Sequence, residues 1–282
     1  MECNGHTKIY GILGSPLGHT LSPALHNASF SHMGMNAVYA PFEVASESLG
    51  DAVRGVRALG ISGVNITVPH KIEVIKYLDE VEGIAKELGA VNVIVNENGR
   101  LLGCNTDVSG FKIMLEKEGI DIKGEKIAVI GAGGASKSVV KALSMMGASE
   151  IYIVNRTYEK ALQISGEMSN NETVVRPVSK SDGKIYDIFN ICTIIVNTTS
   201  LGLKENDELP VRAELISTGH TVIDIIYKPW KTKLLEIAES KGAKVLNGYG
   251  MLVYQAIESF RIWTGQVPPL EVIWDAGLEG RV

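Results

Sequence analysis

One lysine follows a strand-like segment at a position where α/β proteins often place reactive groups. The segment VNITVPHK, residues 64–71, begins with the alternation of apolar and polar residues that is typical of a half-buried strand, and Pro69 ends it. Lys71 comes two residues later, just past the strand end, where open α/β sheets bind ligands. An ammonium group there could donate a proton to a reacting oxygen and stabilise its negative charge. The alternative is a solvated surface charge, as most lysines are.

Hydroxyl, amide and carboxylate groups gather at the expected ends of the neighbouring elements. Asn65 and Thr67 are two residues apart on one strand, so they share a face. A turn or cap explains any single one of these residues equally well, and Ser22 could simply cap the helix that Pro23 opens. Taken together, they indicate a site for a polar small molecule. The set comprises Thr20, Ser22, Asn65, Thr67, Asn92, Asn105 and Asp107.

A glycine-rich turn predicts a dinucleotide site. The segment KIAVIGAGGAS, residues 126–136, leads from a strand through glycines into a helix, whose free N–H groups and positive dipole end suit a pyrophosphate. Ser136 replaces the last glycine of G-x-G-x-x-G, so the fingerprint is imperfect, but the strand before it and the amphipathic helix after it are the required context. The expected phosphate loop is Gly131, Ala132, Gly133, Gly134 and Ala135.

The next strand, EIYIV, indicates which dinucleotide binds. NAD-dependent proteins usually carry Asp or Glu at its end to accept hydrogen bonds from the ribose. Here the strand runs into Asn155, Arg156 and Thr157, with Lys160 close behind. Arg binds a 2′-phosphate as a fork and Lys binds it as a point charge, so the sequence favours NADP. Plain surface charges are the alternative for both cations.

Strand-like and helix-like runs alternate along the chain, which predicts an α/β fold. In the N-terminal part, Asn98-Gly99 between two apolar runs predicts a hairpin, so this sheet should be mixed. Six Val- and Ile-rich runs between residues 126 and 248 have the rhythm of a doubly wound Rossmann-like domain. The tail from about Gly248 reads as one long helix followed by the segment GQVPPLEVIW, and we expect this helix to return to the first domain.

Composition excludes several classes of function. The chain has 282 residues, a net charge of −5 and no basic cluster, so neither nucleic acid nor an anionic membrane is an expected partner. No apolar run reaches the ~20 residues that a membrane span needs. Cys3, Cys104 and Cys192 form no CxxC pair and the histidines form no metal motif, so we expect reduced thiols, no metal and a cytoplasmic location.

The motifs, in their order, resemble those of the shikimate dehydrogenase family. They are GSPLGHTLSPALHN, NITVPHK, GAVN, GCNTD, GAGGAS, NRT, NTTSLGL, DIIYKP and GMLVYQA. The resemblance implies an oxidoreductase that reduces 3-dehydroshikimate to shikimate with NADPH, within chorismate and aromatic amino-acid biosynthesis, and it allows a homodimer. It also implies that residues 1–107 and 248–282 form the substrate-binding and catalytic domain, and that residues 108–247 form the NADP-binding Rossmann domain.

The resemblance also implies roles for individual residues. Lys71 and Asp107 match the catalytic pair. The substrate-binding positions matched are Thr20, Ser22, Asn65, Thr67, Lys71, Asn92, Asp107, Tyr227 and Gln255. The cofactor-binding positions matched are Gly131, Ala132, Gly133, Gly134, Ala135, Asn155, Arg156, Thr157, Lys160, Thr198 and Gly248.

Two departures from the family pattern stand out. Thr20 replaces a serine and adds a methyl group near the expected carboxylate pocket, which could relax discrimination against quinate. Lys137 replaces an arginine, which keeps the charge but loses the fork, and we expect it to affect cofactor affinity alone. Two alternatives therefore remain. One is a quinate/shikimate dehydrogenase paralogue. The other is a non-catalytic NADP-binding regulator, which should lack Lys71 or Asp107.

Overall fold

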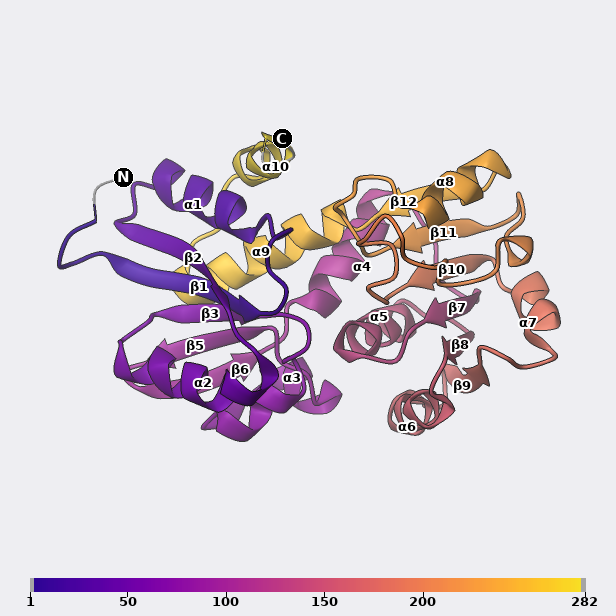
Figure 1. Ribbon diagram of the computed structural model, residues 1–282, viewed down its shortest axis with the longest axis horizontal. Coiled ribbons are helices and arrows are strands. Elements are labelled where there is room, and N and C mark those ends of the chain that lie inside the picture. Colours follow the sequence, from indigo (N-terminus) through magenta and orange to yellow (C-terminus); the bar gives the residue numbers. More distant parts are fainter. Residues whose placement is uncertain (1–2, 280–282) are drawn as a thin grey trace. The chain divides into compact units, whose positions relative to one another are not determined.

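The computed structural model describes residues 3–279 and divides them into two compact units. Unit 1 comprises residues 3–110 and 253–279, and unit 2 comprises residues 111–252. Each unit is built around one six-stranded sheet with helices packed on it (Figure 1). The predicted α/β fold, with one mixed sheet and one Rossmann-like parallel sheet, is confirmed. No helix within the described residues is both long and apolar enough to cross a membrane.

The sheet of unit 1 has the strand order β2-β1-β3-β5-β6-β4. Its strands are β1 Lys8–Gly14, β2 Ala37–Glu43, β3 Gly63–Ile66, β4 Glu80–Val81, β5 Val93–Glu97 and β6 Arg100–Cys104. Strand β1 runs parallel to β2 and β3, whereas β5 is antiparallel to both β3 and β6. The predicted hairpin joins β5 to β6, where Asn98 and Gly99 have φ values of 54° and 92°. Both values are positive, as a tight Asn-Gly hairpin turn requires.

Helices cover both faces of this sheet. The helices of unit 1 are α1 Ser22–His32, α2 Leu49–Ala58 and α3 Gly83–Leu88, with the C-terminal part of α9 Tyr249–Thr264 and α10 Leu270–Glu279. Side chains of β1 alternate between two cores, as a strand dictates. Tyr10 packs with Phe30 of α1 and Phe260 of α9, whereas Leu13 packs with Val53 of α2 on the opposite face.

The sheet of unit 2 is fully parallel, with the order β12-β11-β10-β7-β8-β9. Its strands are β7 Lys126–Ile130, β8 Glu150–Asn155, β9 Val174–Ser179, β10 Ile194–Asn197, β11 Thr221–Asp224 and β12 Lys244–Asn247. Its helices are the C-terminal part of α4 Asp107–Lys117, then α5 Gly134–Met145, α6 Tyr158–Met168, α7 Ile185–Ile191 and α8 Lys233–Ser240. The strand order reverses between β7 and β10, so the carboxyl end of β7 is the switch point where doubly wound sheets bind ligands.

Three local expectations need correction or completion. The long helix expected from about Gly248 is α9, and the segment GQVPPLEVIW that follows it contains the start of a second helix, α10, which begins directly after Pro268-Pro269 and lies against α1. Strand β3 ends at Ile66, so Thr67 lies just beyond the strand. Ser22 is not a helix cap, because Leu21 occupies that position and its side chain makes no capping hydrogen bond.

Candidate active site

Lys71 and Asp107 form a buried ion pair in unit 1. The distance between Lys71 Nζ and Asp107 Oδ2 is 2.6 Å, and only 14% and 6% of the two side chains are exposed. Lys71 lies between β3 and the short helix η2 Glu73–Tyr77, and its carbonyl oxygen accepts a hydrogen bond from Val91 N at 2.8 Å. Asp107 opens helix α4 directly after β6. The pair therefore joins the ends of two strand segments of the same sheet.

Asn92 fixes the orientation of the Asp107 carboxylate. Its amide Nδ2 donates to Asp107 Oδ1 at 2.9 Å and to Thr106 Oγ1 at 3.0 Å. Its Oδ1 accepts from Thr106 N at 2.8 Å. One carboxylate oxygen is thus held by Asn92, and the other is left to face the lysine ammonium.

Asn105 shapes the backbone that presents the carboxylate. Its Oδ1 accepts from Asp107 N at 3.0 Å, and its Nδ2 donates to Ala90 O at 2.9 Å. Such a local amide-to-backbone bond favours a turn just before a helix. Within the GCNTD motif, Asn105 therefore fixes the backbone position of Asp107.

Asn65, on β3, supports this network through hydrogen bonds of its side-chain amide. Its Oδ1 accepts from the Tyr39 hydroxyl at 2.7 Å, and its Nδ2 donates to Asn92 O and to Ser259 Oγ, both at 3.2 Å. Ser259 also lies 3.1 Å from Thr106 Oγ1. Helix α9 is thereby joined to the strand ends that carry the ion pair.

His26 is a buried neutral ring beside this network. It stacks on Tyr39 with ring centroids 4.5 Å apart, and it lies 5.2 Å from Trp263. Within the described residues neither ring nitrogen makes a regular hydrogen bond. Burial lowers the pKa of His26 to about 3, with the nearby Asn65 side chain acting weakly in the other direction. The imidazole is therefore uncharged at neutral pH.

The remaining predicted substrate residues of unit 1 are Thr20, Ser22, Thr67 and Gln255. Thr67 N donates to Leu13 O at 3.0 Å, so it continues the pairing of β3 with β1, which leads to the loop that carries Thr20. Thr20 Oγ1 accepts from the backbone N–H of Ser22 at 3.3 Å. Gln255 lies on α9, where its carbonyl oxygen accepts from Ser259 Oγ at 2.9 Å.

The glycine loop of unit 2 has the form of a phosphate cradle. Gly131 has φ 110°, and a side chain there would meet Thr198 Oγ1 at 2.7 Å, so only glycine fits. Thr198 Oγ1 donates to Ile130 O at 2.7 Å. Ser136, the departure from the glycine fingerprint, is buried and donates to Gly131 O at 2.8 Å. It therefore supports the same turn from the first turn of helix α5, which begins at Gly134.

The end of β8 exposes two cations. Asn155 Nδ2 donates to Thr157 O at 2.8 Å, which closes the turn before α6. Arg156 and Lys160 are exposed and have no ion-pair partner in the part of the chain that the structure describes. Lys137 differs, because its Nζ lies 2.7 Å from Glu167 Oε2 and only 8% of its side chain is exposed. Its ammonium therefore bridges α5 and α6.

Three family models match this chain along most of its length. The shikimate dehydrogenase substrate binding domain matches residues 12–94, the shikimate / quinate 5-dehydrogenase model residues 113–210, and the shikimate 5'-dehydrogenase C-terminal domain residues 248–276. The NADP(+)-dependent shikimate dehydrogenase of Thermococcus kodakarensis is 43% identical over 282 residues, which are 98% of this chain and 98% of that protein. This chain belongs to the shikimate dehydrogenase family.

Other proteins are also similar to this chain over nearly its whole length. The NADP(+)-dependent enzyme of Halothermothrix orenii is 42% identical over 94% of this chain and 93% of its own length. A shikimate dehydrogenase crystallised with NADP+ has a TM-score of 0.89 at 38% identity, covering 100% of this chain and 98% of its own. The Thermus thermophilus enzyme in complex with NADP(H) and shikimate has a TM-score of 0.84 at 34% identity, covering 96% and 99%. Quinate dehydrogenase from Corynebacterium glutamicum in complex with NAD has a TM-score of 0.85 at 29% identity, covering 97% and 99%.

In this member of the shikimate dehydrogenase family, Asp224 organises two loops of unit 2. Its carboxylate accepts from Asn197 Nδ2 at 3.0 Å, from Ile226 N at 3.1 Å and from Thr232 Oγ1 at 2.7 Å. Burial raises the pKa of Asp224 to about 6, although these three hydrogen bonds act to lower it. The residue thereby ties the end of β10, just before Thr198, to the loop that carries Tyr227.

Gly248 of unit 2 occupies a crowded position. A side chain at Gly248 would collide with the Ile225 carbonyl group, so the predicted position accepts glycine alone. Sequence reasoning did not find Tyr39, Thr106, Ser259 and Asp224, which hold the predicted residues in place. Thr106 lies in the motif GCNTD and Asp224 in the motif DIIYKP, so the sequence did point to both of them. Tyr39 and Ser259 come from distant segments and gave none.

Proposed function

We propose that this chain catalyses the reversible NADPH-dependent reduction of 3-dehydroshikimate to shikimate, a step of chorismate and aromatic amino-acid biosynthesis. The observation that carries the proposal is the buried Lys71–Asp107 pair, at 2.6 Å, in a chain whose relatives are NADP(+)-dependent shikimate dehydrogenases. A catalytically silent relative would not need to retain this pair. The NADP-binding regulator is therefore not favoured.

Lys71 is the acid in our proposed mechanism. NADPH, when bound, supplies a hydride to the C3 carbonyl carbon of the substrate. Lys71 Nζ donates a proton to the carbonyl oxygen, on which negative charge develops, and it is left neutral beside the Asp107 carboxylate. Asp107 orients the lysine and accepts a hydrogen bond from a substrate hydroxyl. In the oxidation of shikimate, Lys71 must first be deprotonated and then takes the proton from the substrate hydroxyl.

We assign neutral donors to the rest of the substrate. Thr20, Ser22 and Tyr227 bind the carboxylate, and Thr67 and Gln255 bind ring hydroxyls. The remaining two predicted residues, Asn65 and Asn92, already donate their amide hydrogens to protein atoms. Their part is therefore mainly to position Asp107 and the end of β3. A site of hydroxyls and amides rejects a wrong substrate by leaving buried groups unpaired.

The residues of unit 2 fit NADP. The loop of Gly131, Ala132, Gly133, Gly134 and Ala135 provides the close backbone approach that a pyrophosphate needs, as the crowding at Gly131 indicates. Asn155, Arg156, Thr157 and Lys160 suit the 2′-phosphate, because both cations are exposed and unpaired among the described residues. We assign Thr198 and Gly248 to the nicotinamide half. The predicted split into a substrate domain, 1–107 with 248–282, and an NADP domain, 108–247, stands as part of this proposal.

A steady-state assay of four substrate and cofactor pairs tests the proposal. Shikimate and quinate are each oxidised with NADP+ and with NAD+, and we expect shikimate with NADP+ to give the highest kcat/KM. A preference for quinate with NAD+ would overturn both the substrate and the cofactor assignment. The protein would then be a quinate paralogue, and Thr20, with its extra methyl group, would be the first residue to examine. We further propose a cytoplasmic location, which the three free cysteines support, and a homodimer, which sedimentation at equilibrium tests.

A further inference from the structure

Lys180 lies beside the residues that we assign to the 2′-phosphate, although it belongs to none of the motifs. It follows β9, which pairs with β8 in a register that sets Asn155 opposite Ser179. The backbone N–H of Lys180 donates to Asn155 O at 3.1 Å. Lys180 is therefore anchored at the carboxyl end of β8, where the cofactor residues begin.

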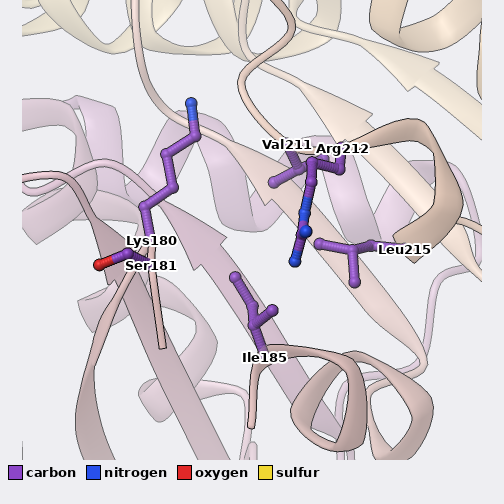
Figure 2. A pocket seen from close by; sticks show the side chains of 6 residues that line it. All are labelled: Lys180, Ser181, Ile185, Val211, Arg212 and Leu215. Carbon is purple, nitrogen blue, oxygen red and sulfur yellow. The ribbon is translucent and has the colours of Figure 1, made fainter. Parts of the chain in front are cut away.

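The Lys180 side chain borders open space. With Ser181, Ile185, Val211, Arg212 and Leu215 it lines a cavity of about 370 Å³ (Figure 2). The lysine chain extends upward in this view, with its ammonium away from the other labelled residues (Figure 2). Arg212, the other cation of this cavity, lies 4.8 Å from the ring centre of Tyr186.

The ammonium of Lys180 is available to a ligand. It forms no ion pair with any residue that the structure describes. The carboxylate closest to it in sequence, Asp182, accepts a hydrogen bond through Oδ1 from the backbone N–H of Lys184 at 2.8 Å. Adjacent strands lie only about 4.8 Å apart, which a lysine side chain can span. The ammonium can thus reach an anion held over Asn155 and Arg156.

We propose that Lys180 is a further specificity-determining residue, whose ammonium contacts the 2′-phosphate of NADP beside Arg156 and Lys160. The inference rests on the proposed NADP site and adds a cation from a different strand. A phosphate monoester carries a charge of about −1.5 to −2 at neutral pH, so it can engage several cations at once. A cofactor that lacks this phosphate gains nothing from Lys180. The residue therefore contributes to the choice of NADP over NAD.

The test compares Lys180→Ala with Lys184→Ala, a matched loss of one exposed lysine four positions away. Calorimetry measures the binding of adenosine 2′,5′-bisphosphate and of adenosine 5′-monophosphate, which differ only in the 2′-phosphate. We expect Lys180→Ala to weaken the bisphosphate roughly 3- to 10-fold, since one exposed charged contact contributes up to about 1 kcal/mol or slightly more. Binding of the monophosphate should be unchanged, Lys184→Ala should behave as wild type, and Lys180→Arg should restore affinity.

Other outcomes overturn the inference in distinguishable ways. Equal effects of Lys180→Ala and Lys184→Ala would show only a general loss of positive charge. Equal weakening of both nucleotides would place Lys180 near the base or ribose and not near the phosphate. A wild-type protein with no preference for the bisphosphate would instead overturn the proposed NADP site, and Lys180 with it.

Discussion

The Lys71 ammonium and the Asp107 carboxylate meet at 2.6 Å in a position where most of both side chains is shielded from water. The two residues are 36 positions apart in sequence, and Asn92 holds the far oxygen of the carboxylate at 2.9 Å. Because the carboxylate is fixed before any substrate arrives, the lysine is oriented in advance. Such preorganisation lowers the cost of stabilising charge in a transition state.

Lys71→Ala removes the proposed proton donor. We expect kcat to fall by about 100- to 10,000-fold, the usual contribution of a positioned acid or base, with the fold retained in circular dichroism. Lys76→Ala is the matched control, because Lys76 pairs with Glu73 at the surface. Near-normal turnover of Lys71→Ala would contradict the mechanism.

The two directions of the reaction should differ in their pH dependence. Oxidation of shikimate requires Lys71 to lose its proton first, whereas reduction of 3-dehydroshikimate requires it protonated. We expect oxidation to speed up toward alkaline pH and reduction to slow down, as initial rates in both directions would show. Identical profiles would mean that another group limits proton transfer.

Asn92→Ala should loosen the carboxylate without removing either member of the ion pair. The change leaves Asp107 Oδ1 and the buried Thr106 N–H without their partner, so we expect a loss of about 1–3 kcal/mol of unfolding free energy. Activity should fall through kcat more than through KM. Asn190→Ala, at an exposed position of α7, should leave both quantities unchanged, as denaturant titration and kinetics would show.

His26 should make the protein less stable in acid. Its pKa is about 3 in the folded protein and 6.5 when solvated, so the unfolded chain binds the extra proton between these values. Its contribution is fully present above pH 6.5 and is lost as pH falls toward 3, at no more than about 1.4 kcal/mol per pH unit. His26→Phe keeps a stacked ring and should flatten this part of the curve in urea titrations. An unchanged slope would contradict it.

Asp224 should make the protein less stable as pH rises, which is the opposite of the effect of His26. Its pKa is raised from 3.8 to about 6, so the folded protein binds the extra proton between these values. Its contribution is full below pH 3.8 and is lost as pH rises through 6, again at no more than about 1.4 kcal/mol per pH unit. Asp224→Asn should therefore gain stability relative to wild type as pH rises from 4 to 7. Parallel curves for the two proteins would count against a buried titrating carboxylate.

The sequence was most informative where structure depends on neighbouring residues. The expected strands KIAVI and EIYIV coincide with β7 and β8, and Asn98-Gly99 gives the hairpin, because strand patterns and turn chemistry are local. Helix α10 was not predicted, although prolines directly before a helix are compatible with its start.

The supporting contacts of the site could not be read from the sequence. Asn65 meets Ser259 across 194 positions, a pairing that only the docking of α9 onto the sheet creates. Lys137 was expected to affect cofactor affinity, and that expectation remains a prediction. Its bond to Glu167 additionally gives it a structural role that depends on how α5 packs against α6. Distances of this kind depend on tertiary packing and leave no local pattern.

The chain crosses from one unit to the other twice, and each crossing falls within a helix. The boundary at residues 110 and 111 falls within α4, and the boundary at 252 and 253 falls within α9. Excision of unit 2 at these points would cut two helices and leave backbone groups without their partners on both fragments. Exchange of cofactor modules between relatives is therefore best made at Thr106 and Gly248, just outside the two helices, so that α4 is transferred whole with the module and α9 stays whole in the recipient.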